Sequence, residues 1–264
     1  MNKLYVIKIG GNIVDNDEAL AVFLDDFANL DANKVLIHGG GKVATKISKA
    51  LGIETEMIAG RRVTDQETVK VVTMVYAGLI NKTIVAGLQA RSCNAIGLSG
   101  ADNNTVQSHK RIVKDVDYGY VGDVDHVNND FLSSLLNHGT TPVLAPITHD
   151  KKGQLLNTNA DTIASEIAIS LSKDFDVELV YCFELPGVMK DINDTASVIP
   201  LIDFTTYSSL KEEGVIVDGM IPKLDNCFNA IDRGVGAVRI TQAQTLTAVV
   251  NEKKELGTKM IKNV

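Results

Sequence analysis

The chain has 264 residues, of which 45% are hydrophobic, and it carries a formal net charge of −7 at pH 7. This length suits one large domain or two closely packed lobes, and the acidic balance argues against nucleic acid or an anionic membrane as the main partner. The three cysteines lie far apart without metal-ligand spacing, so we expect a reducing, cytoplasmic setting and no metal bound by side chains. No apolar run approaches the roughly 18 residues that a membrane span needs, so we expect none.

Strand and helix patterns alternate along the chain. In chain order, the expected elements are a strand over 4–9, a helix around 20–30, a strand over 35–38, a helix around 43–51, a long helix over 66–90, a strand over 95–98, an antiparallel hairpin within 111–127, a helix over 131–137, a strand over 142–147, a helix over 160–171, a strand over 177–183, a helix over 220–231, and strands over 237–241 and 259–261. Such alternation indicates a mostly parallel sheet covered on both faces, with ligands at the carboxyl ends of its strands.

For two of the helices the sequence predicts further detail, namely a cap for one and an apolar face for the other. Asp15 and Glu18 resemble a capping box before the helix around 20–30. The long helix over 66–90 has one apolar face at helical spacing, which offers a stripe for packing against a second copy of the chain. The face consists of Val69, Val72, Tyr76, Leu79 and Thr83.

Two glycine turns follow predicted strands and are candidate phosphate sites. Gly10 and Gly11 end the first strand, and Gly39–Gly41 end the second before a helix begins. Backbone N–H groups in such turns bind phosphate and other anions. The spacing over 39–44 also matches a loose dinucleotide-binding fingerprint, and a plain strand-to-helix turn is the remaining alternative. The P-loop pattern is absent from the sequence, so any nucleotide must be held in another way.

Lys8 stands in an otherwise apolar strand, and only Ile9 separates it from the first glycine turn. An unpaired lysine in a buried strand costs several kcal/mol, so it needs an anionic partner. We expect that partner to be a phosphate. An edge-strand lysine that reaches water is the alternative.

Arg61 and Arg62 follow a glycine and suit bidentate binding of a carboxylate, although such a pair is also common in solvated loops. Lys223 falls in the first turn of a predicted helix, where a cation opposes the helix dipole. That placement favours an anionic partner for Lys223.

Asn157, Asn159 and Asp161 crowd the start of another predicted helix. Capping explains Asn159 well, but it explains all three polar residues less well. Glu184 ends a predicted strand and either serves a nucleotide or merely terminates the strand. The five histidines lack metal-ligand spacing, and we expect none of them to be catalytic.

The ordered motifs resemble those of the amino acid kinase family over essentially the whole chain. The motifs are KIGG at 8–11, HGGGK at 38–42, GRRVT at 60–64, YGYVGDV at 118–124, LNTNAD at 156–161 and DGMIPK at 218–223. The resemblance implies a three-layer α/β/α sandwich around a mostly parallel central sheet. It further implies one domain over 1–264, in which about 1–172 binds an acyl-amino acid and forms a dimer and about 173–264 binds ATP.

The resemblance also implies roles for single residues. Lys8 and Lys223 would flank the transferred phosphoryl group, and Asp161 would hold both lysines. Arg62 would bind a substrate carboxylate. The other implied contacts are the acyl-amino acid with Gly40, Gly41 and Asn157, and ATP with Gly10, Gly11, Glu184 and Gly187.

The implied activity is ATP-dependent phosphorylation of the γ-carboxylate of N-acetyl-L-glutamate, a step of arginine biosynthesis, with Mg²⁺ held mainly by the phosphates. Such a carboxylate has a pKa near ~4.3 and is ionised at neutral pH, so the reaction needs cations rather than a general base. The acyl pocket cannot be read from the sequence, so N-succinylglutamate and a carrier-linked aminoadipate remain alternative substrates. A non-catalytic amino-acid- or dinucleotide-binding module is the alternative from another class, and two separated lysines argue against it.

Two departures from the family pattern affect these expectations. The segment Phe183-Glu184-Leu185-Pro186-Gly187 replaces a turn that usually carries a small hydroxyl residue and an aspartate, so the adenine and ribose contacts stay open. The chain also begins at its first strand, whereas arginine-inhibited hexameric relatives carry an N-terminal helix there. We therefore expect a homodimer that arginine does not inhibit.

Overall fold

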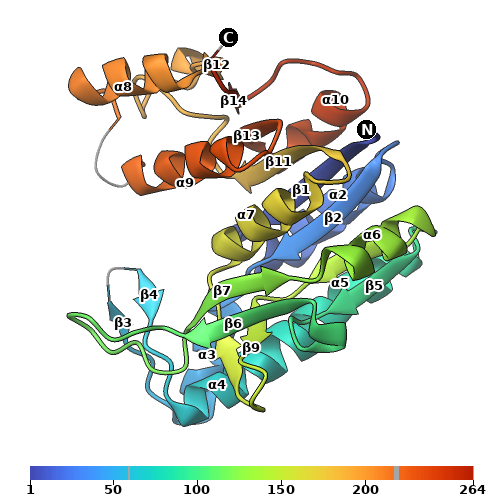
Figure 1. Ribbon diagram of the computed structural model, residues 1–264, viewed down its shortest axis with the longest axis vertical. Coiled ribbons are helices and arrows are strands. Elements are labelled where there is room, and N and C mark those ends of the chain that lie inside the picture. The colour runs from blue at the N-terminus through green and yellow to red at the C-terminus, as the bar shows by residue number, and fades with distance from the viewer. Residues whose placement is uncertain (59, 217–219, 264) are drawn as a thin grey trace.

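The computed structural model in Figure 1 describes residues 1–58, 60–216 and 220–263. Its centre is an eight-stranded sheet with the strand order β12-β14-β13-β11-β1-β2-β8-β5. These strands are β1 (Lys3–Ile9), β2 (Asn33–His38), β5 (Ala95–Leu98), β8 (Thr141–Leu144), β11 (Asp176–Phe183), β12 (Leu201–Ile202), β13 (Ala237–Gln242) and β14 (Thr258–Met260). Neighbouring strands run parallel except β13 and β14, which are antiparallel. The expected mostly parallel sheet is therefore confirmed.

Helices cover both faces of this sheet, as expected for a three-layer sandwich. In Figure 1, α7 and α9 lie in front of the sheet. One buried core joins the sheet to α6 (Asn129–Asn137), α7 (Ala160–Leu171), α8 (Phe204–Glu212) and α9 (Ile221–Asp232). The other core joins the opposite face to α2 (Asp17–Ala28), α3 (Gly41–Ala50), α4 (Gln66–Val72), the π-helix η1 (Thr73–Ile80), α5 (Asn81–Gln89) and α10 (Leu246–Val250).

The period-two alternation of strands decides which face each side chain of β1 and β11 reaches. In β1, Leu4 and Val6 belong to the α7 side, and Tyr5 and Ile7 belong to the α2 side. Lys8 continues the series of Leu4 and Val6 and therefore points to the α7 side. In β11 the parallel register sets Tyr181 beside Lys8, so residues 181 and 183 share that side.

Smaller elements complete the fold beside the main sheet. A four-stranded sheet has the order β10-β9-β6-β7 and a two-stranded ribbon pairs β3 with β4. Their strands are β3 (Met57–Ile58), β4 (Arg61–Arg62), β6 (Val106–Lys110), β7 (Gly122–Val127), β9 (Ile147–His149) and β10 (Leu155–Asn157). The short helices are α1 (Gly11–Val14), η2 (Asp102–Asn104), η3 (Thr195–Ser197) and η4 (Ala243–Thr245). In Figure 1 the ribbon of β3 and β4 lies beside the long loop between β6 and β7.

The hairpin predicted within 111–127 is only partly right. An antiparallel pair forms, but its first strand, β6, ends at Lys110, before the predicted range, and only β7 lies inside it; residues 111–121 form the connection. The predicted strand over 142–147 is wrong as one element. It divides into β8, in the main sheet, and β9, in the smaller sheet. Pro146 stands at the break and has no N–H group to donate to a strand ladder.

The capping-box prediction is wrong by one residue. The N-cap of α2 is Asn16, whose side chain accepts a hydrogen bond of 2.9 Å from the backbone N–H of Ala19. Asp15 instead closes the short helix α1 as its C-cap. Either side chain can cap a helix, and the turn that ends α1 leaves Asn16 with the extended backbone that an N-cap adopts.

The long helix over Gln66–Gln89 is confirmed, but its buried face differs from the predicted one. Val69, Val72 and Tyr76 are buried in the core, so they cannot form a stripe for a second copy. Beyond them the buried apolar positions are Ile80, Ile84 and Leu88. The predicted Leu79 is 53% exposed, and Thr83 is also exposed. The eight residues of the π-helix η1 explain the change, because a π turn accommodates an extra residue and rotates everything after it.

This helix also corrects a second expectation. By length and composition alone, its 24 residues would be long and apolar enough to cross a membrane. In the structure its inner side instead packs against the α2 side of the sheet, as the core helices of globular proteins do. Length and composition alone therefore give weak evidence for a membrane span here.

The helix over 160–171 begins and ends where the sequence predicts, and α9 begins with Pro222 in its first turn. Asp218 and Gly219 of the DGMIPK motif lie outside the described residues.

Candidate active site

Two cavities meet at the carboxyl ends of β1, β2 and β11. The first, here named the Arg62 cavity, has a volume of about 260 Å³ and is lined by Lys8, Gly40, Gly41, Arg62, Asn157 and Asp161, among others. The second, the Phe183 cavity, has a volume of about 450 Å³ and is lined by Gly10, Gly11, Phe183, Glu184, Gly187 and Lys223, among others. Gly41 lines both cavities. The structure thus brings all the site residues expected from the motifs to two adjacent cavities, and their individual roles stay predictions.

Lys8 forms an ion pair with Asp161. The distance between Lys8 Nζ and Asp161 Oδ1 is 2.7 Å. Lys8 reaches the α7 side of the sheet by strand alternation, and Asp161 stands in the first turn of α7, where a carboxylate interacts favourably with the helix dipole. Asn159 caps the same helix by accepting hydrogen bonds from the N–H groups of Asp161 and Thr162. Capping therefore accounts for Asn159, as expected, and Asp161 is left to neutralise a buried lysine.

Lys223 enters the site from α9 and has a different partner. Its Nζ lies 4.7 Å from the centre of the Phe183 ring. Among the described residues Lys223 forms no ion pair, so the structure shows the predicted contact of Asp161 with Lys8 but not a second one with Lys223. Phe183 is the contact that our sequence reasoning missed. The signal was present as a departure from the family turn, but we interpreted it only as a change in nucleotide contacts.

Arg62 is almost fully buried, with 7% of its surface exposed, at the wall of the first cavity. Its Nη2 donates to the carbonyl oxygen of Gly41 and to Thr45 Oγ1, each at 2.8 Å, and its Nη1 donates to Thr55 Oγ1 at 3.2 Å. These acceptors are neutral, and no carboxylate pairs with Arg62 within the described ranges. A buried guanidinium without a counter-ion is strongly attractive to a carboxylate that enters the cavity.

Asn157 lies opposite Arg62 across a short hydrogen-bonded chain. Its Nδ2 donates to Thr64 Oγ1 at 3.0 Å, and the Thr64 hydroxyl donates to the carbonyl oxygen of Arg62 at 3.1 Å. Thr64 therefore orients the side chain of Asn157 and links it to the backbone of Arg62. The two residues predicted to bind one substrate belong to one connected unit.

The two glycine turns are bound to each other. The N–H of Gly39 donates to the carbonyl oxygen of Ile9 at 3.0 Å, and Lys42 Nζ donates to Asn12 Oδ1 at 2.5 Å. Gly40 has a φ of +154°, and a Cβ at this position would lie 2.3 Å from Ile80 Cδ1. Glycine is favoured there because L side chains rarely adopt this positive φ and because Ile80 of the π-helix packs against the turn.

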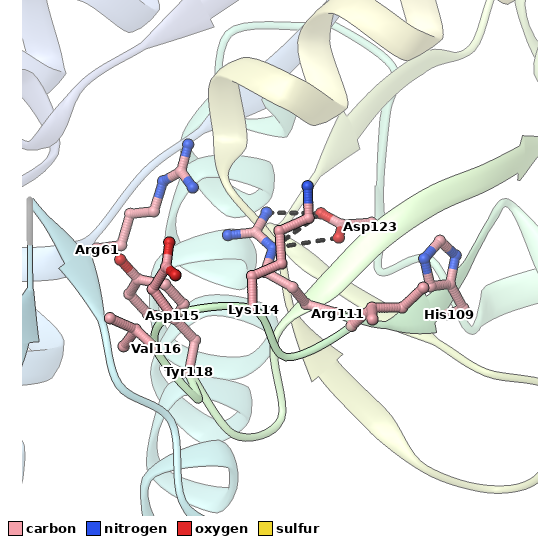
Figure 2. A pocket seen from close by; sticks show the side chains of 9 residues that line it. Arg61, His109, Arg111, Lys114, Asp115, Val116, Tyr118 and Asp123 are labelled. Carbon is pink, nitrogen blue, oxygen red and sulfur yellow. Dashed lines mark hydrogen bonds and ion pairs between the residues drawn. The ribbon is translucent and has the colours of Figure 1, made fainter.

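A third cavity of about 440 Å³ opens beside the first, and Figure 2 shows its side chains. Arg61 and Arg111 line both this cavity and the Arg62 cavity. Arg111 binds the Asp123 carboxylate, with its Nη2 at 2.6 Å from Oδ1 and its Nε at 3.1 Å from each oxygen. These hydrogen bonds raise the pKa of Arg111 and lower the pKa of Asp123. Our sequence reasoning did not single out Arg111, because in an alternating hairpin segment it looks like an ordinary surface residue.

The whole arrangement suits two anionic ligands held next to each other. Arg61, Arg62 and Arg111 line the Arg62 cavity, and Lys42 and Lys223 contribute cations to the otherwise largely apolar Phe183 cavity. The ion pair between Lys8 and Asp161 lies at the centre. Such a set can bring a carboxylate and a phosphate together and offset their repulsion.

The sequence model described as the amino acid kinase family matches residues 3–242. The chain belongs to the amino acid kinase family. Among curated family members, the acetylglutamate kinase of Cytophaga hutchinsonii is 61% identical over 100% of both chains. That of Parabacteroides distasonis is 58% identical over 93% of this chain and 96% of its own.

Solved structures show the same fold at lower sequence identity. An N-acetylglutamate synthase from Neisseria gonorrhoeae, in complex with coenzyme A and N-acetyl-glutamate, superposes with a TM-score of 0.82 at 20% identity. This match covers 100% of the present chain and 60% of that longer chain. Carbamate kinase from Giardia lamblia, bound to AMP-PNP, gives a TM-score of 0.69 at 14% identity and covers 99% of each chain. The fold expected from the family is therefore confirmed.

Proposed function

We propose that this family member uses ATP to phosphorylate the γ-carboxylate of N-acetyl-L-glutamate, which forms an acyl phosphate as a step of arginine biosynthesis. The full-length similarity to acetylglutamate kinases supports the substrate. The observation that carries the proposal is structural. One cavity holds a buried arginine that has no counter-ion among the described residues, the adjacent cavity holds a glycine turn and a lysine, and Gly41 lines both cavities.

ATP would occupy the Phe183 cavity. The backbone N–H groups of Gly10 and Gly11 and the charge of Lys223 fit a chain of phosphates. Mg²⁺ would be held mainly by those phosphates, where it offsets their charge. Glu184 and Gly187 line the same cavity on the side of the second lobe.

The acyl-amino acid would occupy the Arg62 cavity. Arg62 would bind its α-carboxylate, and Asn157, Gly40 and Gly41 would fix the rest of the molecule. All these residues belong to the first lobe, about 1–172, whereas the Phe183 cavity combines residues of both lobes. This distribution supports the division into an acyl-amino-acid lobe and an ATP lobe, with one glycine turn shared between the two.

Phosphoryl transfer would then require mainly that the two ligands are aligned and that cations offset their negative charge. The γ-carboxylate is ionised at neutral pH and attacks the γ-phosphorus directly, the bond to the bridging oxygen of ADP breaks, and no proton moves. Lys8 and Lys223 would stabilise the charge on the transferred group from two sides. Asp161 would keep Lys8 in place.

An assay of acyl phosphate formation tests this proposal. The enzyme with ATP, Mg²⁺ and hydroxylamine should form a hydroxamate from N-acetyl-L-glutamate, and N-succinyl-L-glutamate in a parallel reaction tests the alternative acyl group. The outcome that contradicts the proposal is the absence of a nucleotide-dependent product from N-acetyl-L-glutamate. Product from N-succinyl-L-glutamate alone would support the alternative substrate instead.

We also infer a cytoplasmic homodimer. The three cysteines, Cys93, Cys182 and Cys227, are free and buried, which suits a reducing compartment. On the outer side of the long helix, Met74 and Leu79 expose 57% and 53% of their surfaces. Two exposed apolar side chains five positions apart in the π-helix suit a symmetric contact. Leu79 belongs to the stripe expected from the sequence, whereas Met74 does not, and the other apolar members of that stripe are buried.

A further inference from the structure

The two lysines of the site are held in different ways. Lys8 Nζ lies 2.7 Å from a carboxylate oxygen of Asp161 and 5.7 Å from the centre of the Phe183 ring. Lys223 Nζ lies closer to the same ring, at 4.7 Å, and forms no ion pair within the described part of the chain. One aromatic ring therefore serves as a neighbour to both ammonium groups.

The Phe183 ring is itself held in place by the ring of Tyr181. Tyr181 stands two residues earlier on β11 and stacks on Phe183, with ring centres 5.9 Å apart and an interplanar angle of 4°. The Tyr181 hydroxyl is anchored to Ser165 Oγ at 2.9 Å and donates to the carbonyl oxygen of Asp161 at 3.2 Å. Strand alternation places both rings on the side of the sheet where Lys8 emerges.

A ring and a carboxylate have different effects on a lysine that must act on a phosphate. A carboxylate holds the ammonium group but cancels most of its charge. The quadrupole of an aromatic ring attracts the cation within about 6 Å of the ring centre, yet it adds no negative charge. A lysine held by a ring therefore keeps its full charge for an anionic ligand.

We propose that Phe183 is a positioning residue that holds Lys223, through its ring, in place to stabilise the transferred phosphoryl group. This inference rests on the role proposed above for Lys223. Phe183 acts through that lysine, while Asp161 acts through Lys8. Within the described ranges, the site then combines one lysine paired with a carboxylate and one lysine that contacts an aromatic ring but no carboxylate.

Replacement of the ring by an aliphatic side chain tests the proposal. The variant Phe183→Leu keeps an apolar side chain but removes the quadrupole, and we expect kcat to fall about 2- to 30-fold, from the usual strength of a cation–π contact. Phe183→Tyr keeps a ring face and should retain a kcat close to that of the wild type. The KM for ATP should change little in either variant.

A double-variant cycle separates this role from simple packing in the nucleotide cavity. In a Lys223→Ala background, Phe183→Leu should cause little further loss of kcat, because the ring has no Lys223 left to hold. The same fold loss in both backgrounds, or a loss confined to the KM for ATP, would overturn the proposal. Failure of Phe183→Tyr to retain activity, with its fold intact, would do so as well.

Controls distinguish this proposal from the proposed function. Phe204→Leu removes another aromatic ring, one that packs against Tyr207 and Phe228 away from the site, and should leave kcat unchanged. The Tm of each variant monitors folding. A normal kcat in Phe183→Leu with a strongly reduced kcat in Lys223→Ala contradicts only the role of Phe183. A normal kcat in Lys223→Ala contradicts the role proposed for Lys223 and this inference together.

Discussion

Asn81 donates a hydrogen bond of 3.2 Å from its side-chain amide to Nε2 of His38, deep in the core beside the second glycine turn. The other ring nitrogen of His38, Nδ1, then carries the proton and donates to the carbonyl oxygen of Gly39 at 2.8 Å. Asn81 also donates to the carbonyl oxygen of Val143 at 3.0 Å. A neutral imidazole thus connects the long helix to the turn that lines the Arg62 cavity.

This neutral histidine predicts a pH-dependent stability. Burial lowers the pKa of His38 from 6.5 to about 4, with a smaller opposing contribution from its bond to Gly39. Between these two values the unfolded chain binds a proton that the folded protein does not, so stability decreases as the pH falls from about 6.5 towards 4. The contribution of His38 should amount to about 2 kcal/mol at pH 5 relative to neutral pH.

Urea unfolding at pH 7.5 and at pH 5 measures this effect. His38→Gln removes the titrating group and should show a smaller loss of stability between the two pH values than the wild type. His126→Gln, at an exposed position, is the matched control. Equal pH dependence in His38→Gln and the wild type would contradict the assignment.

Gly40→Ala should destabilise the protein and impair substrate binding. The added Cβ would overlap Ile80 Cδ1, and overpacking of this kind typically costs about 1–3 kcal/mol. Thermal unfolding and the KM for the acyl-amino acid measure the two effects.

Two variants sharpen the test at Gly40. In Gly40→Ala with Ile80→Val, the clashing Cδ1 is gone, so part of the lost stability should return. In Gly41→Ala the new Cβ meets nothing within 4 Å, so the Tm should stay near that of the wild type. A Gly40→Ala protein as stable as Gly41→Ala would show that the π-helix does not constrain the turn.

Lys8→Ala and Lys223→Ala should each lower kcat far more than they raise either KM. Both lysines are placed to stabilise charge on the transferred phosphoryl group, and loss of one such contact typically costs about 10²–10³ in rate. Steady-state kinetics with ATP and N-acetyl-L-glutamate measures the effect. Lys70→Ala removes a lysine from an exposed ion pair and is the control for loss of charge alone. Substantially raised KM values at an unchanged kcat would refute these roles.

Arg62→Ala should instead raise mainly the KM for the acyl-amino acid. A clamp on the α-carboxylate acts equally in the ground state and in the transition state, so kcat should change less. Arg62→Lys keeps the charge but loses the bidentate fork, and it should rescue binding only in part. A reduced kcat at an unchanged KM would assign Arg62 to the chemical step instead.

Light scattering should give the mass of a dimer, and Leu79→Asp together with Met74→Asp should reduce it to that of a monomer. A charged side chain at the centre of a symmetric apolar contact faces its own copy, which opposes association. Val22→Asp, at an apolar residue that is 55% exposed on another helix, is the control. An unchanged dimer in the double variant would place the contact elsewhere on the surface.

Much of the site could be predicted from the sequence because short motifs carry it. Glycine turns at strand ends and charged residues at helix starts are local features, and the parallel sheet gathers them at one edge. The shift of the buried face to Ile80 and Ile84 could not be predicted, since a period of 3.6 residues does not reveal a π turn. The role of Phe183 was missed because its departure from the family turn was interpreted only as a change in the adenine and ribose contacts.

The bond between Gly39 and Ile9 has a consequence for the reaction proposed here. It continues the hydrogen-bond ladder of β1 and β2 beyond the strands, so the two glycine turns stand about one strand spacing apart, roughly 4.8 Å. The strand spacing of the sheet would then set the distance between the bound phosphate donor and its acceptor. If the reaction proceeds as proposed, substitutions of Arg61 or Arg111, which line the Arg62 cavity, would affect the binding of the acceptor but not the spacing of the two turns, which the backbone sets.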